Sequence, residues 1–430
     1  MSKNTWCAAG GTPQYSTDLG LTWHMAARNP IGRGSPHGEF IPDCAYGEGQ
    51  FIMVGTSNDF GGFLGNRTMM GSSDASHYEI IHNPADGGFL NHIAFGGGRW
   101  VAGQGQAAPP LFITAPADGR GWTVPDVSAL VAMNGGSTHL FPLALEYLNG
   151  QFVASVTNGG SQWLGTSPDG EHWTWHAMSS TGMGSFGPSD IGGHQITYMG
   201  GRYVFCLALG PAYTPAGTSP PTLSGIAWAT SLLGPWTITN GFIHPLGNEV
   251  LAPGPFGLLQ ATASSIANNG SVIVAGGTDY EAVMGIAPGI NISTDGGATW
   301  SIATTAPNSI TFGPAETLTW DPIAGLFVLI TSGDHVFTSP DGETWTHIAT
   351  GVFGTGFCTG LGTPPRAGTP LRQRQRNDGL TGGPTRVNAG QNRPTSQQRS
   401  LRVGGGVPNT YAMSPQRCVH RRRSKLWVPT

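Results

Sequence analysis

A short phrase recurs along this chain, and it constrains the fold more than any other feature. Its clearest copies are Ser16-Thr17-Asp18 with Trp23, Ser167-Pro168-Asp169-Gly170 with Trp173, Ser293-Thr294-Asp295-Gly296 with Trp300, and Ser339-Pro340-Asp341-Gly342 with Trp345. Weaker copies are Asp74 with Tyr78, Asp118-Gly119 with Trp122, and Ser231 with Trp236. Seven copies of one phrase indicate a repeat architecture.

Strand-like segments surround each copy, and the fourth repeat shows them best. Residues 142–148 and 151–156 are predicted strands joined by Asn149-Gly150, a pair typical of a tight hairpin because both residues tolerate positive φ. Two more strands are predicted at 163–167 and 173–178, on either side of Asp169-Gly170. The aromatic anchors recur every 44 to 64 residues. Four antiparallel strands at this spacing predict one blade of a β-propeller.

The predicted fold is therefore all-β: a seven-bladed β-propeller of four-stranded antiparallel blades, over residues 1–361. The first repeat begins at Trp6 with what is a second strand by its position, so its first strand is missing. The apolar segment 352–361 is predicted to supply it. Pairing of the N- and C-terminal strands then closes the ring and leaves no free sheet edge.

Charge divides the chain at about residue 362. Residues 1–362 hold 7 Lys and Arg against 23 Asp and Glu, whereas residues 363–430 hold 13 Lys and Arg against Asp378 alone. The segment 362–430, rich in Arg, Pro and Gly, cannot bury a core and is predicted to be an extended or disordered tail. Three interpretations stay open: a solvated tail, a segment that contacts an acidic partner or nucleic acid, and the product of a shifted reading frame.

Some classes of protein are disfavoured by what the residues lack. No stretch approaches the roughly 20 apolar residues of a membrane span. The first residues lack the apolar core of a signal peptide, so we expect no export by that route. The 5 cysteines and 13 histidines show no metal-ligand spacing, so no metal and no cofactor is predicted.

The Ser-x-Asp-Gly-x-x-Trp phrase resembles the Asp-box (BNR) repeat of sialidase-like propellers, over residues 1 to about 361. The resemblance implies that each box is a structural turn between the third and fourth strands of a blade. Its carboxylate would accept backbone N–H groups, its glycine would supply an unusual φ, and its tryptophan would fill the gap between sheets. The predicted structural residues are Asp18, Trp23, Asp118, Trp122, Asp169, Trp173, Asp295, Trp300, Asp341 and Trp345.

Strand order predicts where a binding site lies. The boxes and the hairpins share one rim, so the long loops gather at the opposite rim, where binding surfaces are most common. The loop aromatics are candidates to stack on sugars or partners, and one acidic cluster accompanies them. The predicted ligand-binding residues are Phe60, Phe63, Trp163, Tyr213, Asp279, Tyr280 and Glu281.

Catalysis is not predicted. A sialidase would need an arginine triad, and Arg99 and Arg202 fall at hairpin turns on the other rim. No catalytic residue is assigned, and the favoured function is a non-enzymatic binding or structural propeller. Propellers of this repeat type without a signal peptide resemble bacteriophage virion proteins, which implies a tail or head appendage contacting host surface glycan or a neighbouring virion protein. The alternatives are a glycoside hydrolase with paired carboxylates and an intracellular assembly-factor propeller.

Overall fold

The structure is a computed structural model. It describes residues 5–9, 13–27, 40–57, 66–82, 90–104, 110–158, 161–178, 196–206, 226–239, 261–279, 290–305, 315–331, 333–350 and 361–362.

Seven antiparallel sheets form the structure, and we number them as blades 1 to 7 in chain order. Blade 1 contains β27 (Leu361–Gly362), β1 (Trp6–Ala8), β2 (Gln14–Ser16) and β3 (His24–Met25). Blade 2 contains β4 (Phe40–Gly47), β5 (Gln50–Ser57), β6 (Asn66–Ser72) and β7 (Glu79–His82). Blade 3 contains β8 (Leu90–Gly96), β9 (Arg99–Gln104) and β10 (Phe112–Pro116).

The remaining four blades each have four strands. Blade 4 contains β11 (Phe141–Leu148), β12 (Gln151–Thr157), β13 (Gln162–Ser167) and β14 (Thr174–Ala177). Blade 5 contains β15 (Ile196–Met199), β16 (Arg202–Cys206), β17 (Ile226–Ala229) and β18 (Thr237–Thr239). Blade 6 contains β19 (Ala261–Asn268), β20 (Ile273–Asp279), β21 (Asn291–Ser293) and β22 (Ser301–Ile302). Blade 7 contains β23 (Ala315–Asp321), β24 (Leu326–Thr331), β25 (His335–Ser339) and β26 (Thr346–Thr350).

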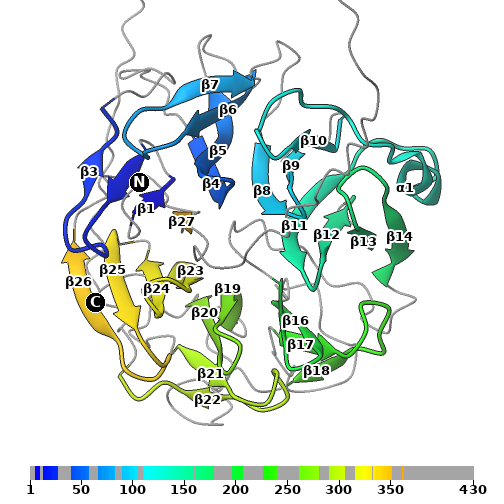
Figure 1. Ribbon diagram of the computed structural model, residues 1–430. Coiled ribbons are helices and arrows are strands. Elements are labelled where there is room, and N and C mark those ends of the chain that lie inside the picture. Colours follow the sequence, from blue (N-terminus) through cyan, green and yellow to red (C-terminus); the bar gives the residue numbers. More distant parts are fainter. Residues whose placement is uncertain are drawn as a thin grey trace, which may run out of the picture. The chain divides into compact units, whose positions relative to one another are not determined.

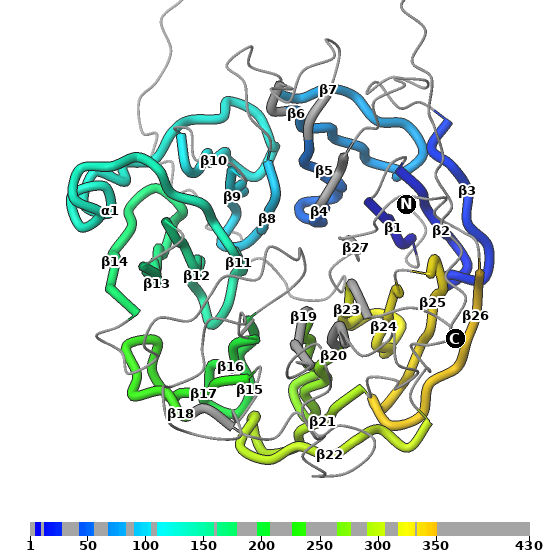
Figure 2. Tube along the Cα trace, turned by 180° about the vertical axis from the view of Figure 1, so that it is seen from behind, coloured from blue at the N-terminus to red at the C-terminus, as the bar shows by residue number. Residues whose placement is uncertain are grey.

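The blades follow one another around a ring, with the first strand of each nearest the centre and the last outermost (Figures 1 and 2). First strands of successive blades contact one another: β4 with β8, β8 with β11, β11 with β15, β15 with β19, and β19 with β23. The predicted seven-bladed β-propeller is confirmed.

The ring closes between the two ends of the propeller, as predicted. Strand β27 pairs antiparallel with β1, with Cys7 opposite Gly362 and Ala8 opposite Leu361, and β27 also contacts β4 of blade 2. The closing strand begins at the last residue of the predicted segment and extends to Gly362, one residue beyond the predicted domain boundary. Residues 351–360 lie outside the described residues.

Blade 3 departs from the predicted four strands. After β10 only an isolated bridge, between Thr114 and Thr123, stands where the fourth strand would be. Pro125 follows within two residues, and a proline has no N–H with which to extend a strand pair. The connection to blade 4 instead contains a short helix, α1 (Ser128–Met133), which the sequence did not predict.

The hydrophobic core is divided among the seams between blades. Seven clusters of buried residues each join two successive blades, and the cluster between blades 7 and 1 includes Trp6, Val328 and Ile330. Because apolar strands in each blade face a neighbour on both sides, their residues are buried in near-continuous runs, such as the second strand β12 from Phe152 to Thr157. The seams therefore decide the stability of the ring.

The chain divides into two units, Met1–Thr369 and Pro370–Thr430. The second unit lies outside the described residues, so the basic tail stays a prediction. Within the described part of the chain, no helix is long and apolar enough to cross a membrane.

Candidate functional site

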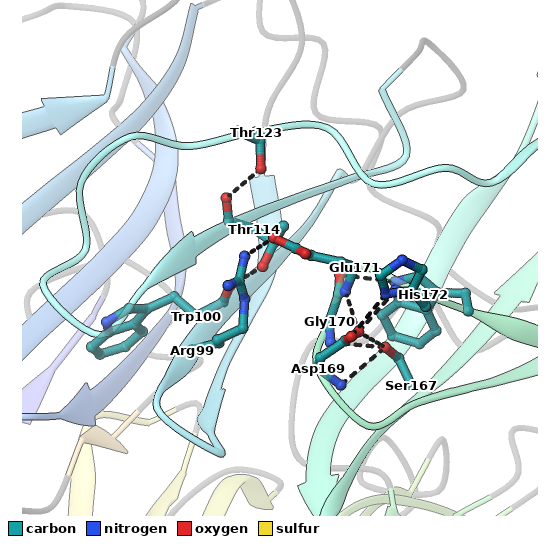
Figure 3. A network of polar contacts seen from close by, with 10 residues as sticks. Arg99, Trp100, Thr114, Thr123, Ser167, Asp169, Gly170, Glu171 and His172 are labelled. Atoms are coloured by element: carbon teal, nitrogen blue, oxygen red, sulfur yellow. Dashed lines mark hydrogen bonds and ion pairs between the residues drawn. The ribbon is translucent and has the colours of Figure 1, made fainter. Parts of the chain in front are cut away.

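The recurring phrase forms a closed network of hydrogen bonds, which Figure 3 shows for blade 4. The hydroxyl of Ser167 donates to the carboxylate of Asp169 at 3.2 Å and accepts the N–H of Gly170 at 2.8 Å. The N–H groups of Glu171 and His172 both donate to Oδ1 of Asp169 at 2.9 Å. We call the segment from the serine to the aromatic anchor the Asp turn.

The anchor tryptophan completes each turn. Trp173 Nε1 donates to the carbonyl of Gly170 at 3.1 Å, and Trp345 Nε1 donates to that of Gly342 at 2.9 Å. Trp23, Trp122 and Trp300 bond in the same way to glycines three residues before them. All these anchors pack in, or against, the cluster that joins their own blade to the preceding one.

The turn carboxylates are held ionised by these contacts. Burial by itself raises the pKa of Asp169, but hydrogen bonds from His172, Glu171 and Ser167 outweigh it and lower the pKa well below its usual value. The pKa values of Asp18 and Asp295 are lowered by the same balance. Carboxylates used in this way fasten the chain and are not arranged for acid–base chemistry at neutral pH.

Each turn also presses against the preceding blade. A Cβ placed on Gly170 would lie 2.4 Å from Cγ2 of Val101 on β9, and one on Gly342 would lie 2.6 Å from Cγ2 of Val274 on β20. Only glycine permits this approach. In the blade 3–4 seam the guanidinium of Arg99 also pairs with the carboxylate of Glu171 (Figure 3).

The two hairpin arginines, Arg99 and Arg202, both form contacts across seams between blades. Arg99 forms the pair just described, and Arg202 donates to the main-chain carbonyl of Asp295 in the next blade. The guanidinium carbon of Arg202 also lies 4.3 Å from the ring centre of Trp228. These arginines join blades, so they are not placed to clamp a substrate carboxylate.

Most predicted ligand-binding residues fall outside the described part of the chain. Phe60, Phe63, Tyr213, Tyr280 and Glu281 lie outside the described residues, and Asp279 is the last residue of β20. These six stay predictions. Trp163 is described: its side chain is 4% exposed and lies on β13 within the cluster between blades 3 and 4. Its ring is therefore covered by protein and is not presented as a stacking platform.

Three potential metal ligands come together at one Asp turn. Asp169, Glu171 and His172 place one ligand atom each within 4.8 Å of one another. Each is already engaged, since His172 Nδ1 lies 2.8 Å from Asp169 Oδ2 and Glu171 pairs with Arg99. These three residues therefore form part of the contact that holds blade 4 against blade 3.

Blade 5 breaks the pattern of the Asp turns. Leu233 stands where the other turns have aspartate, and Trp236 follows Ser231 after five residues instead of the six that separate Ser167 from Trp173. The buried Nε1 of Trp236 has no hydrogen-bond partner among the described residues, whereas each anchor tryptophan described in the other blades donates to a glycine carbonyl. The shortened turn therefore does not fasten blade 5 to blade 4 as the other turns do.

An open hollow lies at this seam, with a volume of about 330 Å³. It is lined, among the described residues, by Asn149, Gln151, Thr166, His176, Tyr198, Tyr203, Thr230, Ser231, Leu232 and Leu233. Pockets that hold small ligands begin at about 300 Å³. The missing aspartate thus coincides with a space of ligand size.

Tyr203 is the central polar group of this hollow. Its side chain is 5% exposed, and its hydroxyl oxygen lies 3.2 Å from Asn149 Nδ2 and 3.4 Å from Gln151 Nε2, both of which donate to it. A tyrosine oxygen that accepts two N–H groups still has its own hydrogen to donate. The hydroxyl of Tyr203 is therefore held by two amides of blade 4 and keeps its own hydrogen for a further acceptor in the hollow.

His176 adds a second distinctive group. It lies three residues after the anchor Trp173, where blade 7 has Ile348 and blade 6 has Ala303. In blade 7 the side chain at this position packs against the Asp turn of blade 1, because Ile348 Cδ1 would lie 2.9 Å from a Cβ on Gly20. Blade 4 has a polar, half-buried imidazole there, facing the hollow. The hollow lies at the rim of the hairpins and Asp turns, because Asn149 and Ser231 line it, and not at the opposite rim where the sequence predicted binding. The sequence signal for this site was available in the absent aspartate of the Ser231 copy.

A second open hollow, of about 250 Å³, lies along the first strands of blades 4 to 7. Glu146, Thr197, Asn268 and Trp320 are among its lining residues. The amide of Asn268 is engaged on both sides, donating to the hydroxyl of Thr197 and accepting the N–H of Gly270 at 3.0 Å. Its described lining residues include no hydroxyl held by two side-chain amides as that of Tyr203 is, so the blade 4–5 hollow is the stronger candidate site.

Comparison with known proteins yields likenesses of fold. No model of a protein family matches this sequence, and no curated protein matches it. Among solved structures, YCF48 from Cyanidioschyzon merolae matches with a TM-score of 0.43 and 13% identity, covering 76% of this chain and 95% of that one. PorZ, a surface component of the type-IX secretion system of Porphyromonas gingivalis, matches with a TM-score of 0.47 and 12% identity, covering 79% and 44%. The GH74 enzyme of Niastella koreensis matches with a TM-score of 0.36 and 14% identity, covering 81% and 55%.

Proposed function

We propose that this propeller is a non-enzymatic binding protein and that it holds a glycan in the hollow between blades 4 and 5. The observation that carries the proposal is the hydroxyl of Tyr203, which two amides hold at the wall of a ligand-sized hollow and which keeps its own hydrogen to donate. Sites for small molecules combine a few oriented polar groups with apolar walls, and a hydroxyl of this kind can donate to an oxygen of the ligand. The amides of Asn149 and Gln151 fix the orientation of this donor.

Binding fits the hollow better than hydrolysis does. Glycoside hydrolysis uses two carboxylates on either side of the scissile bond. The described residues that line the hollow include amides, hydroxyls and one imidazole, but no Asp or Glu. The carboxylates of the Asp turns are engaged in the fastening of blades, so they are not available for that role.

We further propose a bacteriophage virion as the setting, with host surface glycan as the ligand and neighbouring virion proteins as partners. The support for it is the resemblance of the repeat to those of virion propellers. Mass spectrometry of purified virions tests this setting: recovery of the chain's peptides supports it, and recovery only from cytoplasmic fractions of the cell contradicts it.

The binding function is tested with the purified chain on a glycan array beside a panel of glycosidase substrates. Glycan binding without product release is the expected result. Product release that disappears in Asp279→Ala or Glu281→Ala would replace the proposal with a hydrolase. A stable cellular protein partner, with no glycan bound, would favour an assembly factor.

A further inference from the structure

We infer that the hollow between blades 4 and 5 takes one neutral pyranose unit of the glycan, and that the hydroxyl of Tyr203 donates to an oxygen of that sugar. This inference rests on the proposed binding function and adds the ligand class and the residue that recognises it. The sialidase-like resemblance of the repeat would instead imply an acidic sugar, so the two alternatives differ in charge and can be separated by experiment.

The charge of the lining selects a neutral ligand. Among the described residues of the hollow, none is Asp, Glu, Lys or Arg, and His176 is the only residue that can carry a positive charge. A carboxylate or sulfate brought into this hollow would lose water without gaining a permanently charged partner, which is costly. An uncharged sugar carries no such cost.

The hydrogen-bonding groups match hydroxyls, which both donate and accept. Tyr203 offers its O–H, while the amide carbonyls of Asn149 and Gln151 stay available as acceptors because each amide donates to Tyr203 through its nitrogen. Thr166, which carries a further hydroxyl, also lines the hollow. Alternation of donors and acceptors over a small area suits adjacent hydroxyls of a sugar ring.

The same hollow offers apolar surface for the C–H face of a sugar. Leu233, at the position that holds aspartate in the other turns, is 52% exposed. Tyr198 lines the hollow too, with its ring centre 4.6 Å from that of Tyr203. The mixture of a few oriented polar groups with apolar walls is characteristic of sites that bind small molecules.

The substitution Tyr203→Phe tests the inference with little risk to the fold. The equivalent second-strand position holds Phe51 in blade 2, Phe152 in blade 4 and Phe327 in blade 7. A phenylalanine therefore fits this place in a blade, and the substitution removes only the hydroxyl. The matched control is Tyr147→Phe, which removes a hydroxyl from blade 4 outside the hollow.

Binding of lactose, maltose, cellobiose and sialyllactose, together with the neutral and acidic glycans of an array, would be measured by calorimetry and array fluorescence. We expect a neutral glycan to bind, Tyr203→Phe to weaken it about tenfold, and Tyr147→Phe to leave it unchanged. Thr166→Val is a second deletion of a hydroxyl from the hollow, expected to weaken binding severalfold should Tyr203→Phe lower expression.

The outcomes separate the inference from the function on which it rests. A preference for sialyllactose over lactose, or neutral binding that neither Tyr203→Phe nor Thr166→Val weakens, overturns the inference and leaves a glycan-binding propeller. Capture of a peptide or protein at the hollow, lost in Tyr203→Phe, overturns the sugar class. Absence of any glycan binding by the unmodified chain overturns the proposed function and the inference together.

Discussion

The indole Nε1 of Trp6 donates a 2.6 Å hydrogen bond to Oδ2 of Asp321, a residue 315 positions later in the chain. Both side chains are fully buried in the seam between blades 7 and 1. The other carboxylate oxygen of Asp321 accepts the N–H groups of Ile323 and Ala324 in its own hairpin. The bond therefore connects β1, the first strand of the chain, to the hairpin between β23 and β24 of blade 7.

We predict that Trp6→Phe lowers the free energy of unfolding by about 1.5–3 kcal/mol. It removes one donor from a buried carboxylate, and hydrogen bonds to charged groups contribute at this level. Urea unfolding followed by tryptophan fluorescence measures it. Trp23→Phe is the control: it removes an indole bond to the neutral carbonyl of Gly20 from a half-buried ring, and is expected to cost about 0.5–1.5 kcal/mol. Equal losses of unfolding free energy in the two variants would contradict the prediction that the Trp6–Asp321 bond stabilises the ring more than an indole–carbonyl bond does.

A second prediction concerns the glycine of the Asp turn. Gly170 has a φ of +73° and no room for a Cβ beside Val101, whereas Gly150 has a φ of +82° and open space around it. Gly150→Ala is expected to cost about 1–2 kcal/mol for the left-handed backbone alone. Gly170→Ala is expected to cost a further ~1–3 kcal/mol from overpacking.

The double variant Gly170→Ala with Val101→Ala separates these contributions. Removal of the valine methyl groups makes room for the new Cβ, so the two changes should cost less together than the sum of their separate costs. Strict additivity in urea unfolding would show that the turn does not press on the preceding blade as the structure indicates.

The third prediction is a pH dependence of stability. Burial raises the pKa of Asp169, but the hydrogen bonds that it accepts lower it well below that of an unfolded aspartate. A carboxyl with a lowered folded pKa contributes stability above its unfolded pKa of about 3.9, and that contribution is lost as pH falls toward the folded value. Asp169→Asn should therefore be less stable than the unmodified chain at pH 7, and the difference should shrink below pH 4. Chemical unfolding at pH 7, 4 and 3 measures it; a difference independent of pH would contradict the assignment.

The fourth prediction concerns a histidine pair on the outer strands of blade 7. Nδ1 of His335 lies 3.1 Å from Nε2 of His347, and burial, followed by the charge of His347, lowers the pKa of His335. The unfolded chain therefore binds this proton more readily than the folded chain, and stability is lost as pH falls below about 6.5. His335→Gln should reduce the loss of stability between pH 7 and pH 5, measured by thermal unfolding. His172→Gln is the contrasting variant, since the pKa of His172 is raised, first through its hydrogen bond to Asp169 and then through the charge of that residue.

Several features of the fold followed from local patterns in the sequence. The Asn149-Gly150 pair predicted a hairpin, and both residues have positive φ, with β11 and β12 on either side. The spacing of anchors predicted the number of blades, and the first repeat's missing strand predicted closure by the other end of the chain. These signals are local because a turn is specified by its own few residues, and a strand is specified by the pattern of apolar residues along it.

Other features departed from what the recurring phrase predicted. In blade 6 the glycine that bonds Trp300 and presses on Val204 is Gly297, not the Gly296 of the sequence phrase, because that turn is one residue longer than the turn of blade 4. Blade 3 lacks a fourth strand, and Trp163, which the sequence analysis placed at the loop face, lies in a seam. The burial of Trp163 was decided by packing between blades 3 and 4.

The amino-acid sequence alone determined a closed ring of seven antiparallel blades fastened by Asp turns, since strand pattern and turn chemistry recur in register. It also contained the exception at Ser231–Trp236, without revealing its consequence. Only the tertiary structure brought that shortened turn next to Tyr203, Gln151 and His176, which come from three other strands in two blades. A hollow, and a hydroxyl held by amides of the neighbouring blade, are properties of packing between blades, so they exist only once the blades meet.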